Sequence, residues 1–335
     1  MPNEKKGIKM KTKVFMIMAA AALVMAGCSN DENEVADNRN SEIRLSSGVS
    51  VQTRAFDGMD TQLPDGRTVA VYVDKTGGTP QLYGNNVLTA DGNGSFKGGT
   101  TMYFPEDKSA VDIYAFHTNG TLAEAFPATA VTHAVEADQS GETNYLKSDL
   151  LYSVSKNNAV SKTAIPLTFY HMLVKVQVAI KAGAGTPNLD EATVSIMGTQ
   201  LKADFTPDKS ADINNATPAT AQAARAGMIA VTATDNAAAD IKLSAAVTTG
   251  TDFTSAVYND AVIVPQTVAQ GTKFIKVKLS NGSELFHKLA AGTTFESGKK
   301  YQYQITVNLT GLTVTSTVAD WESVGNPVQG GAEME

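Results

Sequence analysis

The stretch YQYQITVNL, Tyr301–Leu309, decides the fold class, because apolar and polar residues alternate along it without a break. Successive side chains of a β-strand point to opposite faces of a sheet, so this pattern predicts a strand with one buried face and one solvent face. The run Met172–Ile180 alternates in the same way, with Lys175 and Gln177 between its apolar residues. No stretch of the sequence shows a convincing helical period of 3.6 residues. The sequence therefore predicts an all-β protein.

Shorter runs with the same alternation flank this stretch, at 43–51, 69–73, 111–115 and 275–279. Asn281-Gly282 lies between two apolar runs, which is typical of a tight hairpin turn. Many short strands joined by turns indicate β-sandwiches. Roughly 300 residues follow the N-terminal leader described below, enough for about two domains. We expect them at 55–168 and 169–335.

Residues 208–250 differ from the rest of the chain, because they are rich in Ala, Thr, Asp and Asn. We expect a long surface excursion here, with an Ala-rich helical turn near Ala219–Arg225.

The N-terminus has the pattern of a lipoprotein signal peptide. Five lysines between residues 5 and 13 precede Val14–Ala26, an apolar run too short to span a membrane. Ala26 and Gly27 then give the small side chains that a lipoprotein peptidase needs before Cys28, whose sulfur would carry the lipid. The sequence predicts a signal peptide at 1–27 and lipidation at Cys28. A free cysteine in a short membrane helix is the alternative, and Met10 is a second candidate start.

Composition limits the chemistry of the exported part. Cys28 is the only cysteine, so we expect no internal disulfide and no thiolate metal site. Removal of residues 1–27 takes away five lysines and Glu4, leaving 22 basic and 33 acidic residues and a net charge of −11. This balance argues against binding to nucleic acid or to anionic membrane surfaces. Residues 29–41 are polar and acidic, as in a flexible tether.

Catalytic and metal-binding motifs are not recognisable. Asp91–Ser95 resembles the start of a calcium loop, but Phe96 and Met102 stand where such a loop needs Gly and Glu, so we interpret it as a turn. The four histidines are far apart and share no ligand spacing. We therefore expect no cofactor, no metal and no enzymatic activity. The many carboxylates leave a glycosidase-like pair open.

Several segments, in their order and spacing, carry a resemblance to a known family. They are Tyr103–Pro105, Val111–Phe116, Asp149–Ser153, Pro166–Val176, Phe295–Tyr301 and Asp320–Trp321. Together they resemble the fimbrillin-like family, the type V pilus subunits of anaerobic Gram-negative bacteria, across most of residues 41–321. His117-Thr118 departs from the aromatic residue and proline that the family often has there.

The resemblance implies two tandem transthyretin-like β-sandwiches and a structural role, as stalk or tip, in a cell-surface pilus. It also implies lipidation, export to the outer membrane and trimming by an arginine-specific protease. The matching cleavage site is Arg54-Ala55, and Arg44 is a rival. Residues 28–54 would then form a lipidated tether and a removable first strand.

Strand exchange with another pilus subunit follows from this route. The removed strand would carry Ile43, Leu45, Val49 and Val51, and its loss would open an apolar groove. An extended C-terminal segment of another subunit, with Leu312, Val314 and Val318 on one face, would fill the groove by strand addition. The alternatives are ordinary pairing within the chain, as in an uncut anchor subunit, and a surface lipoprotein that binds glycan without polymerising. A host ligand is left open.

Overall fold

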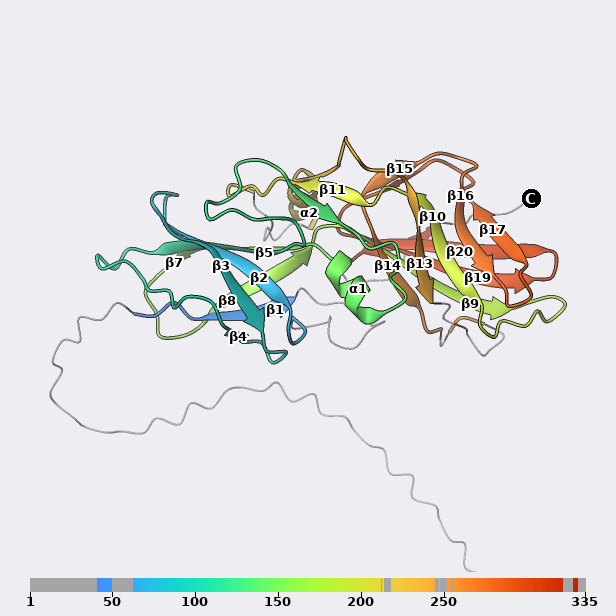
Figure 1. The fold of residues 1–335 in the computed structure, drawn as a ribbon, viewed down its shortest axis with the longest axis horizontal. Coiled ribbons are helices and arrows are strands. Elements are labelled where there is room, and N and C mark those ends of the chain that lie inside the picture. The colour runs from blue at the N-terminus through green and yellow to red at the C-terminus, as the bar shows by residue number, and fades with distance from the viewer. Residues whose placement is uncertain are drawn as a thin grey trace, which may run out of the picture. The chain divides into compact units, whose positions relative to one another are not determined.

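The structure is a computed structural model, and it describes residues 41–49, 63–211, 213, 218–244, 247, 252–254, 256–321 and 328–330. The described residues are nearly all β, which confirms the predicted fold class (Figure 1). Residues 40–335 form one compact unit.

One seven-stranded sheet contains the strands from the first part of the chain. Its order is β1 (Leu45–Val49), β8 (Ile165–His171), β7 (Leu151–Asn158), β5 (Val111–His117), β2 (Thr68–Lys75), β3 (Gln81–Ala90) and β4 (Phe96–Lys97). Neighbouring strands are antiparallel except for β1, which runs parallel to β8. Strands β2 and β5 are buried along nearly their whole length, because both faces of the sheet are covered at its centre.

Two further sheets face one another across a shared core. The five-stranded sheet has the order β14 (Asn259–Ile263), β9 (Val174–Ala182), β19 (Lys299–Asn308), β20 (Gly311–Asp320) and β21 (Val328–Gly330). The four-stranded sheet has the order β13 (Ala239–Ser244), β10 (Thr193–Thr199), β16 (Lys273–Lys278) and β17 (Glu284–Lys288). Strand β19 contains most of the stretch YQYQITVNL, and its Tyr and aliphatic residues are buried while the Gln, Thr and Asn residues between them are half-buried. This alternation is the one that the sequence predicts.

The remaining elements are short. They are the three-stranded sheet β12 (Ile229–Val231), β11 (Lys202–Phe205) and β6 (Val131–Ala134), the pair β15 (Gln266–Val268) and β18 (Thr293–Phe295), and the helices α1 (Glu142–Ser148) and α2 (Pro218–Ala226). Helix α2 confirms the Ala-rich helical turn. Gly282 has a positive φ of 86° between β16 and β17, which confirms the predicted hairpin.

Residues 208–250 are not only a surface excursion, and that interpretation is wrong for its second half. Strand β13 is the edge strand of the four-stranded sheet, where Ile241 and Leu243 are fully buried. Met228, after α2, is also buried. A few large apolar residues, spaced among many alanines and threonines, are enough to dock this segment on the core, although their sequence pattern is weak.

The buried apolar residues form two clusters. The smaller lies on the β1 side of the seven-stranded sheet and includes Ile43, Val71 and Phe169. The larger combines residues of that sheet's opposite face, such as Tyr72 and Phe116, with the core of the two C-terminal sheets. Because the larger cluster draws residues from both sides of position 168, the division into domains at 55–168 and 169–335 stays a prediction.

Candidate functional site

Strand β1 is held on both of its edges. On one edge it pairs with β8 in parallel register, from Leu45 opposite Ile165 to Val49 opposite Phe169. On the other edge, the N–H of Ile43 donates to the carbonyl of Met102 at 2.8 Å, and the N–H of Ser47 donates to the carbonyl of Gly94 at 2.9 Å. Strand β1 therefore fills a slot between β8 and the segment 94–104.

The side chains of β1 and of the two residues before it separate into two faces. Ile43, Leu45 and Ser47 point into the smaller cluster and are 4%, 9% and 8% exposed, respectively. Glu42 and Arg44 are exposed and form an ion pair of 3.1 Å with each other. Two of the four residues predicted for the removable strand are thus placed on its buried face.

The other residues of the predicted site are less fully placed. The backbone of Val49 belongs to β1, but its side chain lies outside the described residues, as do Cys28, Val51, Arg54 and Ala55. Ser47 was missed as a residue of the buried face because its side chain is polar. A strict period of two residues, counted from Ile43, could have found it.

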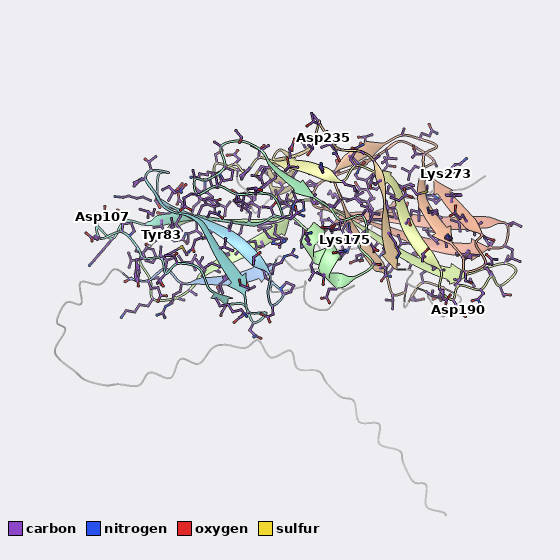
Figure 2. All side chains as sticks on the ribbon, viewed as in Figure 1. Tyr83, Asp107, Lys175, Asp190, Asp235 and Lys273 are labelled. Atoms are coloured by element: carbon purple, nitrogen blue, oxygen red, sulfur yellow. The ribbon has the colours of Figure 1, made fainter. Side chains whose placement is uncertain are left out.

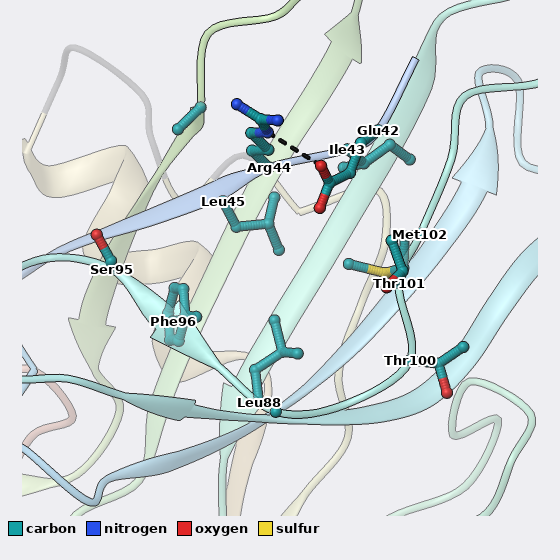
Figure 3. A pocket seen from close by; sticks show the side chains of 12 residues that line it. Glu42, Ile43, Arg44, Leu45, Leu88, Ser95, Phe96, Thr100, Thr101 and Met102 are labelled. Atoms are coloured by element: carbon teal, nitrogen blue, oxygen red, sulfur yellow. Dashed lines mark hydrogen bonds and ion pairs between the residues drawn. The ribbon is translucent and has the colours of Figure 1, made fainter. Parts of the chain in front are cut away.

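The floor of this slot is apolar, and a pocket lies at its side. Leu167 and Phe169 of β8 and Val71 of β2 are fully buried and belong to the same cluster as Ile43 and Leu45. A pocket of about 440 Å³, partly open to solvent and lined by polar as well as apolar residues, lies beside the strand. Figure 3 shows the apolar side chains around it, which are Ile43, Leu45, Leu88, Phe96 and Met102.

The candidate donor residues lie in β20, between β19 and β21 in a different sheet. Leu312 pairs with Val307, Val314 with Ile305 and Val318 with Tyr301, all along β19. Leu312 and Val314 are 3% and 4% exposed in the larger cluster, whereas Val318 is half-buried. Figure 1 shows β9, β19 and β20 side by side. In this chain the segment is therefore paired intramolecularly.

A buried polar network lies where the two apolar clusters meet. The Asp149 carboxylate accepts a hydrogen bond of 3.0 Å from Arg67 and lies 2.9 Å from Nδ1 of His171, whose ring stacks on Trp321 at a centroid distance of 4.1 Å. Burial disfavours the carboxylate, but the neighbouring His171 and Arg67 outweigh it and hold the pKa of Asp149 below its usual value. The network joins Arg67, just before β2, to Trp321, just after β20.

A second buried ion pair accompanies this network. Lys175, labelled in Figure 2 near α1, contacts Asp260 at 2.6 Å, and Gln177 donates to the other oxygen of the same carboxylate at 2.9 Å. Two charges this deeply buried are stable only when they are paired and hydrogen-bonded. These contacts hold β9 against β14, so they support the scaffold rather than forming an open site.

The histidines are separate: His133, His171 and His287 are buried, and His117 is half-buried. Burial lowers the pKa of His117 to about 3 and that of His133 to about 4. Burial also lowers the pKa of His171, against the attraction of Asp149. Among the described residues, no three His, Cys, Asp or Glu side chains are placed to hold a metal ion together.

The motif Asp91–Ser95 is a turn between β3 and β4. The Asp91 carboxylate accepts the N–H of Asn93 at 2.8 Å and the N–H of Ser95 at 2.9 Å. These two backbone bonds lower the pKa of Asp91. The two bonds explain why an acidic residue stands at this position, and the explanation needs no bound ion.

The family model of fimbrillin-like proteins matches residues 53–321. The chain belongs to the fimbrillin-like family. The match begins at the residue before Arg54 and ends at Trp321, so it covers the body of the structure and not β1.

Relatives of this fimbrillin-like chain agree with the assignment. It is 29% identical over 346 residues to "Putative fimbrium subunit Fim1C" of Bacteroides uniformis, covering 97% of this chain and 98% of that protein. A crystal structure of a "putative cell adhesion protein" from Bacteroides uniformis has a TM-score of 0.57 and 22% identity, covering 84% of this chain and 98% of that chain. A second, from Bacteroides ovatus, has a TM-score of 0.59 and 14% identity, covering 86% and 100%. The two structures share the fold.

Membership makes this fimbrillin-like chain a structural protein of the cell surface and not an enzyme. Within the described residues, no helix is both long enough and apolar enough to cross a membrane.

Proposed function

We propose that this protein is a stalk or tip subunit of a cell-surface pilus, exported as a lipoprotein, cut after Arg54 by an arginine-specific protease and polymerised by strand exchange. One observation carries the proposal: β1 is a short strand that fills an apolar slot and is bonded on both edges. Its loss would expose unpaired backbone groups and apolar side chains along the whole slot.

The position of the proposed cut suits this role. Arg54 lies between the end of β1 at Val49 and Leu63, where the described chain resumes. Cleavage there severs the covalent link of β1 to the body without touching β2 or any later strand. The same cut removes the predicted lipid anchor at Cys28, so it would free the subunit from the outer membrane as the slot opens.

Arg44 is the weaker candidate for cleavage. Its side chain is exposed, but its carbonyl accepts the N–H of Ile165 at 2.8 Å, so its backbone belongs to the paired edge of β1. Proteases cut chain that can leave the fold locally, and a paired strand opposes this. A cut after Arg44 would also leave Leu45–Val49 in the slot.

The proposed donor is a C-terminal segment with Leu312, Val314 and Val318 on its apolar face. In the uncut chain this segment pairs with β19 over ten residues and with β21 over three. Donation therefore requires β20 to separate from β19. Leu312 and Val314 then leave the larger cluster and must be buried elsewhere. An uncut anchor subunit is the second candidate function, because both β1 and β20 are fully paired within one chain.

The test begins with the exported chain, residues 29–335, treated with an arginine-specific protease. We expect a new N-terminus at Ala55 and a ladder of oligomers in gel filtration and denaturing gels without boiling. Arg54→Ala should stay uncut and monomeric, while the matched control Arg44→Ala should behave like the unaltered chain. Cleavage at Arg54 that leaves only monomers would contradict strand exchange and favour the anchor or a glycan-binding lipoprotein.

A further inference from the structure

Lys209 and Asp74 form an ion pair between two distant parts of the chain. Asp74 lies near the end of β2 in the seven-stranded sheet and is fully buried, whereas Lys209 follows β11 and has a side chain that is 30% exposed. The ammonium of Lys209 contacts one carboxylate oxygen of Asp74, and the other oxygen is buried without a hydrogen-bond partner among the described residues. A buried charge with an unsatisfied oxygen is costly.

Aromatic rings hold the side chain of Lys209 over this carboxylate. The Nζ atom of Lys209 lies 4.5 Å from the ring centre of Phe126 and 5.2 Å from that of Tyr114. The backbone before it is also held, because the hydroxyl of Tyr152 donates to the carbonyl of Asp208 at 3.3 Å. The amine is thereby kept beside one carboxyl group, and such positioning makes a reaction within one molecule fast.

A second buried carboxyl group lies beside the first. Asp112 of β5 is the antiparallel partner of Asp74 and is 7% exposed. Directly opposed residues of two strands lie on the same face of the sheet, with Cβ atoms about 5 Å apart. Oδ1 of Asp112 accepts the N–H of Asn157 at 2.7 Å and the hydroxyl of Thr76 at 3.1 Å. These bonds hold the carboxyl group of Asp112 next to the ion pair.

The buried pair of Lys175 and Asp260 differs in both respects. The residue opposite Asp260 is Gln177, not a second acidic residue. Gln177 donates to one oxygen of the Asp260 carboxylate at 2.9 Å, and Lys175 contacts the other at 2.6 Å. Both oxygens of Asp260 therefore have partners, so this pair is a stable ion pair and a natural comparison for the pair of Lys209 and Asp74.

We propose that Lys209 and Asp74 join covalently in the folded protein, through an amide between Nζ of the lysine and Cγ of the aspartate. A proton first passes from the ammonium to the carboxylate, which leaves a neutral amine beside a neutral acid, and surroundings of low polarity favour uncharged groups. The lone pair of the amine attacks Cγ, and Asp112 carries the amine proton to the leaving hydroxyl. A C–N bond forms, a C–O bond breaks and one water molecule leaves. Nothing is oxidised or reduced.

The amide ties β2 to the segment after β11, across 135 positions of the chain. A covalent tie that closes so long a loop stabilises a protein chiefly by restricting its unfolded state. Both residues follow Arg54, so the tie outlasts the proposed cleavage. The inference does not depend on strand exchange, and it gives a subunit that bears load a bond that unfolding forces do not break.

The direct test is the mass of the exported chain, residues 29–335, measured after full denaturation. We expect a mass lower than that of the sequence by one water molecule. Trypsin should then release peptide 68–75 joined to peptide 203–225, without cleavage after Lys209, because trypsin does not cut at an acylated lysine. The full mass of the sequence, or a loss of water without the joined peptides, would overturn the proposal.

Substitutions separate the amide from a simple ion pair. Lys209→Arg keeps the positive charge but removes the amine, so we expect the full mass and a thermal midpoint lower by about 10 °C. Asp112→Asn keeps the shape of the side chain, and we expect a folded protein of full mass. The matched control is Asp107→Asn, which changes an exposed carboxylate paired with Lys75 and should leave the amide intact.

The comparison pair sets the remaining limits. The tryptic peptides that contain Lys175 and Asp260 should stay separate in the same digest. If these peptides are joined and those of Lys209 and Asp74 are not, the proposal is wrong. If Asp112→Asn still forms the amide at Lys209, the role given to Asp112 is wrong.

Discussion

Strands β1 and β20 have similar sequence patterns, but the fold holds them very differently. Strand β1 pairs over five residues with β8, places Ser47 in its buried face and lies beside a pocket. Strand β20 pairs over ten residues with β19, and Leu312 and Val314 are closely buried in the larger cluster. The difference indicates that an alternating pattern alone does not make a strand removable. We expect the length of its pairing and the fit of its buried face to decide this.

The largest expected effect comes from a charge on the buried face of β20. Val314→Asp places a carboxylate among fully buried aliphatic side chains, where it has no partner. We expect the uncut chain to lose on the order of 3–5 kcal/mol of unfolding free energy or to fail to fold. Urea unfolding measures this, with Thr315→Asp on the exposed face as the control. A small loss for Val314→Asp would mean that β20 is held as loosely as β1.

Acid should weaken the protein through its buried histidines. The folded-state pKa of His133 is about 4, below its ordinary value of 6.5, so the unfolded chain takes up the proton first as pH falls. Above pH 6.5 His133 is neutral in both states and does not lower the unfolding free energy. Between pH 6.5 and pH 4 the unfolding free energy then falls by about 1.4 kcal/mol per pH unit. His117, with a pKa of about 3, adds to the loss and extends it.

His133→Gln isolates this effect. The ring of His133, in β6, lies 2.9 Å from the carbonyl of Ser148, at the end of α1, and glutamine can keep a donor there. We expect a flatter dependence of unfolding free energy on pH between 6.5 and 4, and hydrogen exchange should show whether β1 opens before β20 in acid. An unchanged slope would contradict a role for His133.

Truncation of matched leucines compares the two strands directly. Leu312→Ala should cost about 2–5 kcal/mol, as is usual for a closely packed core leucine. Leu45→Ala should cost less, because the pocket beside it already leaves part of its surface without contacts and because β1 can detach locally instead of unfolding the chain. Equal costs, or equal hydrogen-exchange protection of Ser47 and Val314, would remove the contrast.

The smallest effect concerns the exposed face of β1. Arg44→Ala breaks only its exposed ion pair with Glu42, so we expect a change within about 0.5 kcal/mol in unfolding free energy. Thermal unfolding checks this, and the variant then serves as a stable control for cleavage at Arg54. A large loss would show that the pair anchors β1.

Much of the fold was predictable because it depends on local alternation. The buried residues Tyr301, Tyr303, Ile305 and Val307 follow from a period of two residues, and Asn281-Gly282 follows from the positive φ that its turn requires. The buried strand β13 was not predictable, since its two large apolar residues lie in a segment dominated by alanine and threonine. Ser47 was missed for a related reason, because side-chain polarity hides its place on the buried face.

The sequence by itself determined the all-β class, the strands with strict alternation and the family resemblance, because each of these depends on residues close together in the chain. Only the tertiary structure decided that β1 runs parallel to β8, that Arg67, Asp149, His171 and Trp321 meet in one buried network, and that β20 is closely packed while β1 is not. These features depend on contacts between residues far apart in sequence. Such contacts are set by how whole sheets pack, which no local pattern records.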